Sequence, residues 1–311
     1  MADDDPSVRN LVVLALELEG FTVLAAADGR EALEMACLHH PAAVILDAVM
    51  PHLNGMEVSR RLRLELGRGP AVVMLTGRTD VADRVAAFAA GADDYVVKPV
   101  RVTELVDRVK RHLHWPSPRG TGRLLGSPDL YEDLRRRLDA GEATAAVCVE
   151  VGGLPPFSRH YSFARSERVL RWLADVLLRL AAERPGTTVG RLGAEDFLVV
   201  TSPDATAGLT EALLDAFAAR VCGFYDPADA VRGWIEVVDR SGQTRRHRPL
   251  ALSVGVASSA SGASGHHLDL VERAAEMARY ARTPEGSRVA VDRRRVMEKV
   301  EERASTRSHS R

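Results

Sequence analysis

The chain has 311 residues, of which 46% are hydrophobic and 27% charged, and its formal net charge at pH 7 is −1. Such a composition is typical of a globular protein with two domains, and the near-neutral charge excludes a general attraction to nucleic acid or to anionic membranes. No apolar run approaches the roughly 20 residues of a membrane helix, and the acidic N-terminus is unlike a signal peptide. The three cysteines lie far apart without metal-ligand spacing, so we expect a cytoplasmic protein that does not enter a membrane.

Short apolar runs alternate with amphipathic runs in the first third of the chain. The apolar runs predict strands at residues 21–26, 42–46, 71–75 and 94–97. The amphipathic runs predict helices at residues 29–39, 55–66, 80–90 and 102–113, and another helix begins near Pro6. This alternation implies a parallel sheet with helices on both faces, in which functional side chains lie just past the carboxyl ends of the strands.

Polar side chains are placed at that edge of the predicted sheet. Asp47 ends the most apolar strand, Thr76 ends the next strand, and Lys98 follows the last one. Asp3 and Asp4 come just before the first helix. Carboxylates are ligands that Mg2+ prefers, and an ammonium group offsets the charge of a transferring phosphoryl group. The set predicts a phosphoryl-transfer site in which Asp47 is the nucleophile, although Asp47 taken alone could simply cap the next turn.

Residues 1–113 resemble the receiver domain of two-component response regulators. The resemblance rests on residues 3–9, 27–33, 47, 50–55, 76–77, 91–95 and 98–99. It implies a flavodoxin-like (βα)5 fold, Mg2+ as cofactor and a histidine kinase as partner. The implied site residues are Asp47 as phosphoacceptor, Asp3 and Asp4 as metal ligands with the backbone carbonyl of Val49, Thr76 and Tyr95 as the switch pair, and Lys98 as the phosphate-sensing lysine. A degenerate receiver that never takes up phosphate is the alternative.

The first strand departs from this family pattern. The family has an apolar, central strand immediately before its acidic pair, whereas only Met1 and Ala2 precede Asp3 here. Without that strand, residues 44–46 would lack a neighbour on one side, and each buried unpaired backbone group costs about 1–3 kcal/mol. We therefore expect the first strand to be truncated and the native N-terminus to lie upstream of Met1, which the intact mass of the native protein would test.

A segment rich in proline and glycine, residues 114–126, predicts a linker to a second domain at residues 127–292. A charged tail at residues 293–311 is expected to be disordered. Within the second domain, periodicity predicts helices at residues 130–138, 165–184, 209–222 and 268–281, and strands at residues 145–151 and 288–291. Residues 189–200 predict a hairpin with Glu195 and Asp196 at its tip, and residues 234–238 and 249–256 predict a second hairpin.

This second domain resembles the GGDEF domain, an α+β nucleotidyl-cyclase-like fold that condenses two GTP molecules into cyclic di-GMP. The resemblance rests on the hairpin tip at residues 193–197, on residues 252–257 and on the stretch at residues 149–169. It implies that Glu150 and Glu195 hold Mg2+ beside a bound nucleotide. The other implied nucleotide-binding residues are Gly193, Ala194, Ser158, Glu167, Asp196 and Arg282.

Several of these positions depart from the family pattern. Glu150 replaces an aspartate, and Mg2+ geometry tolerates the longer side chain badly. Ala194 places a methyl group where the backbone should approach phosphate, and Asp196 is shorter than the family's glutamate. Ser158 and Glu167 replace the residues that read guanine, which weakens discrimination between bases. Because the changes affect metal, phosphate and base recognition together, they predict a catalytically degenerate domain.

We therefore predict a response regulator that homodimerises on phosphorylation and whose second domain senses a nucleotide, GTP or cyclic di-GMP, or binds a protein without turnover. The alternatives are an active, phosphorylation-controlled diguanylate cyclase or a domain with a changed substrate, so the sequence leaves open whether the chain is an enzyme. No basic recognition helix is visible, and direct DNA binding is not expected. The basic run at residues 245–248 predicts an exposed edge strand, with phosphate or an acidic partner as the alternative.

Overall fold

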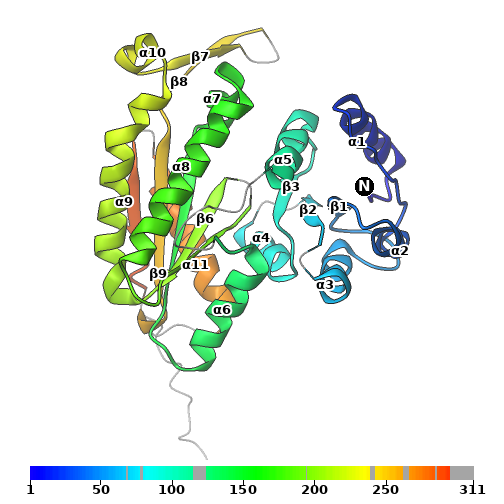
Figure 1. Ribbon diagram of the computed structural model, residues 1–311, viewed down its shortest axis with the longest axis horizontal. Coiled ribbons are helices and arrows are strands. Elements are labelled where there is room, and N and C mark those ends of the chain that lie inside the picture. Colours follow the sequence, from blue (N-terminus) through cyan, green and yellow to red (C-terminus); the bar gives the residue numbers. More distant parts are fainter. Residues whose placement is uncertain are drawn as a thin grey trace, which may run out of the picture.

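The computed structural model describes residues 1–67, 69–77, 80–114, 124–193, 195–238, 242–261, 266–283 and 286–294. The chain forms two parts that lie side by side, the first coloured blue to cyan and the second green to red in Figure 1. Residues 115–123 of the expected linker at 114–126, and residues 295–311 of the expected disordered tail at 293–311, lie outside the described residues. No described helix is both long and apolar enough to cross a membrane.

The first part is a parallel sheet with helices on both faces (Figure 1). Its strands stand in the order β1 (Ala43–Asp47), β2 (Ala71–Thr76) and β3 (Asp94–Val97). Its helices are α1 (Pro6–Leu18), α2 (Gly29–His39), α3 (Gly55–Leu66), α4 (Val81–Ala89) and α5 (Val102–His114). The side chains of Asp5, Asp28, Asn54 and Asp80 accept hydrogen bonds from first-turn N–H groups of α1 to α4, and these caps fix where the helices begin.

Alternate residues of β1 and β2 enter two separate apolar clusters. Val44 and Val72 pack with the cluster that includes α2 and α3, whereas Ile45 and Val73 pack with α1 and α5. Such near-continuous apolar strands are buried on both faces, as the sequence predicted for this sheet. The sheet thereby leaves its functional side chains at the carboxyl ends of the strands.

Residues 21–26 do not form the predicted strand. In the described chain, residues 21–25 join no strand ladder, and Ala26 pairs through a single bridge to Ala2, which also bridges Leu46. A strand needs a neighbour along its length, and Met1 and Ala2 reach only its end. The Met1 ammonium donates a hydrogen bond to the Leu24 carbonyl (2.8 Å), and burial lowers the pKa of this ammonium to about 6.

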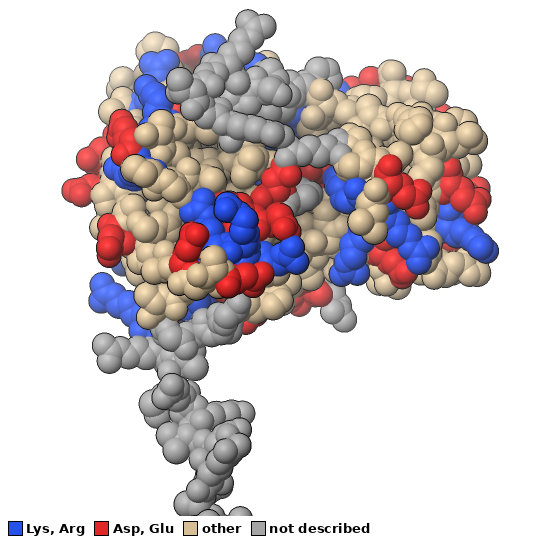
Figure 2. Space-filling model, turned by 60° about the horizontal axis from the view of Figure 1, so that its bottom comes forward, with Lys and Arg blue, Asp and Glu red and all other residues tan. Residues whose placement is uncertain are grey.

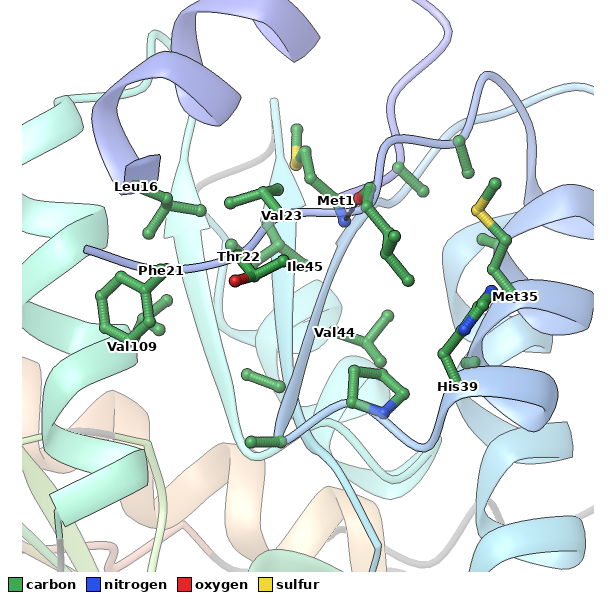
Figure 3. A pocket seen from close by; sticks show the side chains of 18 of the residues that line it. Met1, Leu16, Phe21, Thr22, Val23, Met35, His39, Val44, Ile45 and Val109 are labelled. Atoms are coloured by element: carbon green, nitrogen blue, oxygen red, sulfur yellow. Dashed lines mark hydrogen bonds between the residues drawn. The ribbon is translucent and has the colours of Figure 1, made fainter. Parts of the chain in front are cut away.

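An apolar cavity of about 400 Å3 lies beside Met1, between residues 21–24 and β1 (Figure 3). Its lining includes Leu16, Phe21, Val23, Val44, Ile45 and Val109. The cavity lies beside the segment in which the first strand is expected to be truncated. The expected truncation of that strand stays a prediction.

The second part is a mixed sheet in the order β10-β9-β4-β6-β5. The central strand β4 (Ala145–Gly152) is antiparallel to β6 (Asp196–Thr201) and to β9 (Ala251–Ser258). At the two edges, β5 (Thr188–Arg191) is antiparallel to β6, and β10 (Arg288–Val291) is parallel to β9. The pairing of β5 with β6 confirms the predicted hairpin with acidic residues at its tip.

Helices cover both faces of this second sheet. Val147 and Val149 of β4 pack with α8 (Phe163–Ala182) and α9 (Thr206–Val221). Ala146 and Cys148 face the other side, toward α6 (Ser127–Asp139) and α11 (His267–Ala281). The remaining short elements are α7 (Leu154–His160), α10 (Pro227–Arg232), β7 (Ile235–Val238), β8 (Thr244–His247) and 3-10 turns at Pro203–Ala205, Cys222–Phe224 and Ser259–Ser261.

The predicted second hairpin is wrong in its second strand. β7 pairs with β8, whereas residues 249–256 lie mostly in β9, between β4 and β10 in the large sheet. Residues 252–257 are buried on both faces and are mostly apolar, so they belong in the large sheet rather than in an exposed ribbon. β8 carries the basic run, and Arg245 and Arg246 are exposed, as expected for an edge strand.

The two parts share an apolar contact through α4. Val81, Val85 and Phe88 of this helix belong to the same buried cluster as Leu130 of α6 and Leu270 of α11. Phe88 is fully buried although it lies on the outer helix layer of the first sheet. The receiver-like part therefore packs directly against the second part (Figure 1).

Candidate functional site

Carboxylates converge at the carboxyl edge of the first sheet. One oxygen from each of Asp3, Asp4 and Asp47 lies within 4.8 Å of the others. Asp47 ends β1, and its N–H donates to the Ala2 carbonyl (2.9 Å). This hydrogen bond holds Asp3, the next residue, beside Asp47. A Cβ on Gly55 would stand 2.3 Å from the Asp47 carbonyl, so only glycine lets α3 begin this close to the site.

Lys98 bridges two of these carboxylates. Its Nζ lies 2.9 Å from Asp3 Oδ2 and 3.0 Å from Asp47 Oδ1. Burial disfavours charge on Lys98, but the hydrogen bonds with Asp3 and Asp47 outweigh burial and raise its pKa. Burial also raises the pKa of Asp47, although Lys98 opposes that shift. The arrangement keeps a cation beside the carboxylate that would receive a phosphoryl group.

The donor set fits a magnesium ion. Asp3, Asp4 and Asp47 offer oxygen ligands from one small region, and Mg2+ prefers such ligands while keeping several waters. The backbone of Val49 hydrogen-bonds to the Asp47 carboxyl group, and the Val49 side chain is exposed. The predicted role of the Val49 carbonyl as a metal ligand stays a prediction.

The predicted switch residues lie on neighbouring strands. Thr76 ends β2, and its carbonyl accepts a hydrogen bond from the Lys98 N–H (2.7 Å). Tyr95 lies on β3, and its ring meets Phe88 of α4 edge-on at 5.9 Å between centroids. Arg84 of α4 donates to the Tyr95 hydroxyl (3.3 Å), and burial raises the pKa of Tyr95. Tyr95 thus stands between the phosphoacceptor edge and the boundary with the second part.

A second group of acidic residues lies on the second sheet. Glu150 of β4 stands opposite Asp196 of β6 in the antiparallel register, and Glu195 precedes Asp196 at the hairpin tip. Glu167 of α8 is buried nearby. Arg282 Nη2 lies 2.6 Å from Glu150 Oε2, so this predicted nucleotide-site residue does reach the acidic group.

The remaining predicted nucleotide residues are less closely grouped. Ser158 lies on α7, and its Oγ accepts a hydrogen bond from Ser166 (3.4 Å). Gly193 has a φ of +94°, a conformation that favours glycine, and Ala194 lies outside the described residues. Burial raises the pKa of Glu167, and burial together with the charge of Glu150 raises the pKa of Asp196 to about 7.

Two arginines of the first part reach this acidic group, and the sequence did not single them out. Arg84 of α4 lies 3.4 Å from Glu150 Oε1 and 3.7 Å from Asp196 Oδ2. Arg111 of α5 lies 3.3 Å from Glu167 Oε1 and pairs closely with Glu195. Arginines on amphipathic helices are ordinary surface residues, so no sequence pattern marks these two. Their contacts depend on how the two parts pack.

The predicted metal ligands Glu150 and Glu195 do not fit Mg2+ in this arrangement. A guanidinium group contacts each carboxylate, and its charge repels a second cation. Across the described residues, Asp3, Asp4 and Asp47 form the acidic group whose geometry suits a metal. Glu150 and Glu195 are therefore not available as ligands of a second Mg2+ ion while the two parts are packed together.

Comparisons with known proteins place the first part in a family. The model of the response regulator receiver domain matches residues 1–110. Response regulator MprA of Mycolicibacterium vanbaalenii is 42% identical over 118 residues, which cover 38% of this chain and 51% of that protein. MprA of Mycobacterium leprae is 43% identical over 116 residues, covering 37% and 50%. The chain spans about half the length of the curated relatives it matches.

Solved structures match a similar share of the chain. The receiver domain of Francisella response regulator 1452 is 28% identical, covering 36% of this chain and 92% of that one, with a TM-score of 0.35. The chemotaxis protein CheY4 of Vibrio cholerae is 33% identical, covering 36% and 94%, with a TM-score of 0.35. From the family match and the curated relatives, residues 1–110 are a response regulator receiver domain, as the sequence predicted.

Proposed function

We propose that the protein is a two-component response regulator that takes up a phosphoryl group on Asp47 from a histidine kinase and passes the signal to its second part. The observation that carries the proposal is the convergence of three carboxylates and Lys98 at one edge of a receiver-domain sheet. We also propose that the protein is cytoplasmic and homodimerises when phosphorylated.

The side chains suit phosphoryl transfer to an aspartate. An Asp47 oxygen attacks phosphorus and forms an acyl phosphate, while the leaving group departs from the opposite side. Asp3, Asp4 and Asp47 would hold Mg2+, which when bound offsets negative charge on the phosphoryl oxygens. Lys98 supplies a further positive charge beside Asp47, and the Thr76 hydroxyl is placed at the end of β2 to donate to a phosphoryl oxygen.

For the second part we propose a GGDEF-like domain that senses a nucleotide or binds a protein without turnover. The antiparallel pairing of β4 with β6, which brings Glu150 opposite Asp196, supports this assignment. The arginine contacts of Glu150 and Glu195 favour the inert interpretation over an active cyclase. On the face shown in Figure 2, acidic and basic side chains are interspersed over the described surface.

Phosphorylation of Asp47 is tested on the full chain. The protein is incubated with acetyl phosphate and Mg2+, and intact mass spectrometry measures the gain of one phosphoryl group. We expect the gain in the wild type and its absence in Asp47→Asn, which keeps the size of the side chain but lacks the nucleophilic carboxylate. Equal labelling of both proteins would overturn the assignment of Asp47.

Turnover is tested separately from binding. Beryllofluoride-treated and untreated protein is incubated with Mg2+ and GTP, and liquid chromatography measures any cyclic dinucleotide. We expect GTP to bind without product. Product that disappears in Glu195→Ala would instead establish the second candidate, an active diguanylate cyclase.

A further inference from the structure

Four acidic residues of the second part, Glu150, Glu167, Glu195 and Asp196, contact arginines of the receiver domain. Glu150 is 3% exposed and Glu167 is 4% exposed, although acidic side chains of this kind are ordinarily on the surface. Buried carboxylates require a cation or hydrogen-bond donors to compensate them. In this chain, cations of the receiver domain, Arg84 and Arg111, contact Glu150 and Glu167. The second part adds Arg282 on Glu150 and Arg171, at 4.0 Å, on Glu167.

The two receiver arginines are themselves buried. The side chain of Arg84 is 9% exposed and that of Arg111 is 3% exposed. Arg111 contacts two carboxylates, Glu167 and Glu195, and its guanidinium also lies over the Phe163 ring at 5.3 Å. Ion pairs removed from water in this way are screened by salt far less than surface pairs, and breaking one leaves the other charge buried and uncompensated.

The hairpin tip fits closely against the receiver domain at the same place. A Cβ on Gly193 would stand 3.0 Å from Asp94 Oδ1 and 3.4 Å from Phe88 Cζ, both of which belong to the receiver domain. The backbone at the tip is therefore covered as well as its carboxylates. A phosphate group that approached this backbone would meet Phe88 and Asp94 first, so the receiver domain covers the tip sterically.

A hollow of about 670 Å3 lies beside the arginine contacts, between α5 and α7. Arg101, Arg108 and Arg111 of the receiver domain line one side, and Ser158 and Glu195 of the second part line the other. Its volume is within the range of small-molecule sites, about 300–1,000 Å3. A nucleotide-sized ligand would fit the volume of the hollow, but Arg111, which lines it, is paired with Glu195.

We propose that the receiver domain closes the acidic site of the second part, because Arg84 and Arg111 occupy the carboxylates that a Mg2+-bound nucleotide would need. Receiver packing and binding of the metal nucleotide therefore exclude one another. This inference rests on the nucleotide-binding role proposed above for the second part, and it adds how that site is regulated.

The test measures the affinity of full-length protein for Mg2+-GTP by isothermal titration calorimetry. Arg84→Ala/Arg111→Ala removes both cations, and Val85→Asp weakens the apolar contact of α4 with α6 and α11 while leaving the arginines in place. Arg61→Ala is the matched control, because it breaks an Arg–Glu pair of 2.7 Å on the exposed face of α3. Amide hydrogen exchange at residues 188–201 reports separately whether the hairpin is uncovered.

Both opening variants should bind Mg2+-GTP more tightly than the wild type, by about 5- to 150-fold, the usual range of coupling between sites. Arg61→Ala should match the wild type. Arg84→Lys/Arg111→Lys keeps both charges, and we expect it to stay closed, which separates the loss of charge from a general loss of stability. Faster exchange at residues 188–201 should accompany tighter binding in both opening variants.

Two different failures are distinguishable. Equal, measurable Mg2+-GTP affinities in all variants, with unchanged exchange at the hairpin, would overturn the closure by the receiver domain. Faster exchange without any GTP binding in the opening variants would overturn the proposed nucleotide role of the second part, whereas phosphorylation of Asp47 is measured independently.

Discussion

Lys98 is the residue whose removal most directly tests the phosphoacceptor site. Lys98→Ala would leave Asp3 and Asp47 without the cation that lies 2.9–3.0 Å from their oxygens. Uncompensated buried charge is costly, so we expect a loss of about 2 kcal/mol in the free energy of unfolding, less than for a fully buried pair because Lys98 is 26% exposed. Labelling by acetyl phosphate should also be slower, because less charge is offset in the transition state.

Lys110→Ala is the matched control for that prediction. Lys110 pairs with Glu19 at 2.6 Å, but Glu19 is 47% exposed, so the pair contributes at most about 1 kcal/mol. Urea denaturation and the rate of labelling are compared for the two variants. Equal effects of the two substitutions would show that Lys98 neither stabilises the buried carboxylates nor assists phosphorylation of Asp47.

Asp196 predicts a pH dependence of stability. Its pKa is about 7 in the folded chain because of burial and the charge of Glu150, whereas the ordinary value is 3.8. Between these values the folded state binds a proton that the unfolded state has lost. The contribution of Asp196 to stability therefore falls as pH rises from about 4 to 7 and stays constant above that range.

Asp196→Asn should remove this slope, because an amide does not ionise. Relative to the wild type, the variant is expected to gain stability steadily from pH 4 to pH 7 and to gain nothing more by pH 8. Urea midpoints across this range measure the difference, and Asp204→Asn changes the same atoms at an exposed position after β6 as a control. A constant difference between Asp196→Asn and wild type at all pH values would contradict the shifted pKa.

At the scale of single residues, the sequence predicted which side chains lie at the edge of the first sheet but not which residues contact the acidic group of the second. Asp47 and Lys98 each end or follow a parallel strand, so their contact at one edge follows from local pattern alone. Arg84 and Arg111 meet Glu150 and Glu195 across two parts of the chain. These contacts depend on how the two folded parts pack, and no residue spacing along the chain predicts that packing.

At the scale of secondary structure, the best predictions are those with a local start signal. α2 and α3 have the predicted bounds, and Asp28 and Asn54 cap their first turns and so fix where they begin. The strand at residues 249–256 was predicted correctly as a strand but was given the wrong partner. Partner choice between β8 and the large sheet is decided by burial on both faces, which depends on distant strands.

The cavity beside Met1 predicts that a strand can be added there. We expect the sequence Val-Leu-Val-Val, fused before Met1, to lie between residues 22–25 and β1 and to bury its side chains in the roughly 400 Å3 cavity. A net gain of about 1 kcal/mol would raise the melting temperature of the receiver domain by roughly 4–8 °C. Differential scanning calorimetry measures this shift.

The control for the added strand is Gly-Ser-Gly-Ser at the same position. It has the same length, but it lacks apolar side chains, so it should leave the melting temperature close to that of the unmodified chain. If both extensions shift the transition equally, the cavity does not accept a strand. The result would then also weaken the expectation that the family's central strand belongs at this place.

At the scale of the whole molecule, a continuous chain of contacts joins the two acidic sites. Lys98 pairs with Asp47 and directly follows β3, and β3 carries Tyr95. The hydroxyl of Tyr95 accepts a hydrogen bond from Arg84, and Arg84 pairs with Glu150 of the second part. A change in the position of β3 or Lys98 would therefore alter the contact that closes the second site. Coupling between the two sites is measured as the change that a ligand at one site causes in the affinity of the other.

Beryllofluoride, which mimics a phosphoryl group on Asp47, provides that measurement. The closed arrangement has Lys98 held between Asp3 and Asp47, and a phosphoryl group would draw Lys98 away from this position. We expect beryllofluoride to tighten Mg2+-GTP binding at constant Mg2+, and GTP to tighten beryllofluoride binding by the same factor, because coupling free energies are reciprocal. Asp47→Asn should show neither effect.

The same measurement in the double variant tests whether phosphorylation acts through the arginine contacts. In Arg84→Ala/Arg111→Ala the second site is expected to be open already, so beryllofluoride should change its GTP affinity little. If beryllofluoride changed the GTP affinity of this variant by the same factor as that of the wild type, phosphorylation would act on the second part by a route independent of these arginines. If beryllofluoride weakened GTP binding in the wild type, the modified receiver domain would favour the closed arrangement instead. The sign of the coupling shows which of the two arrangements the modification stabilises.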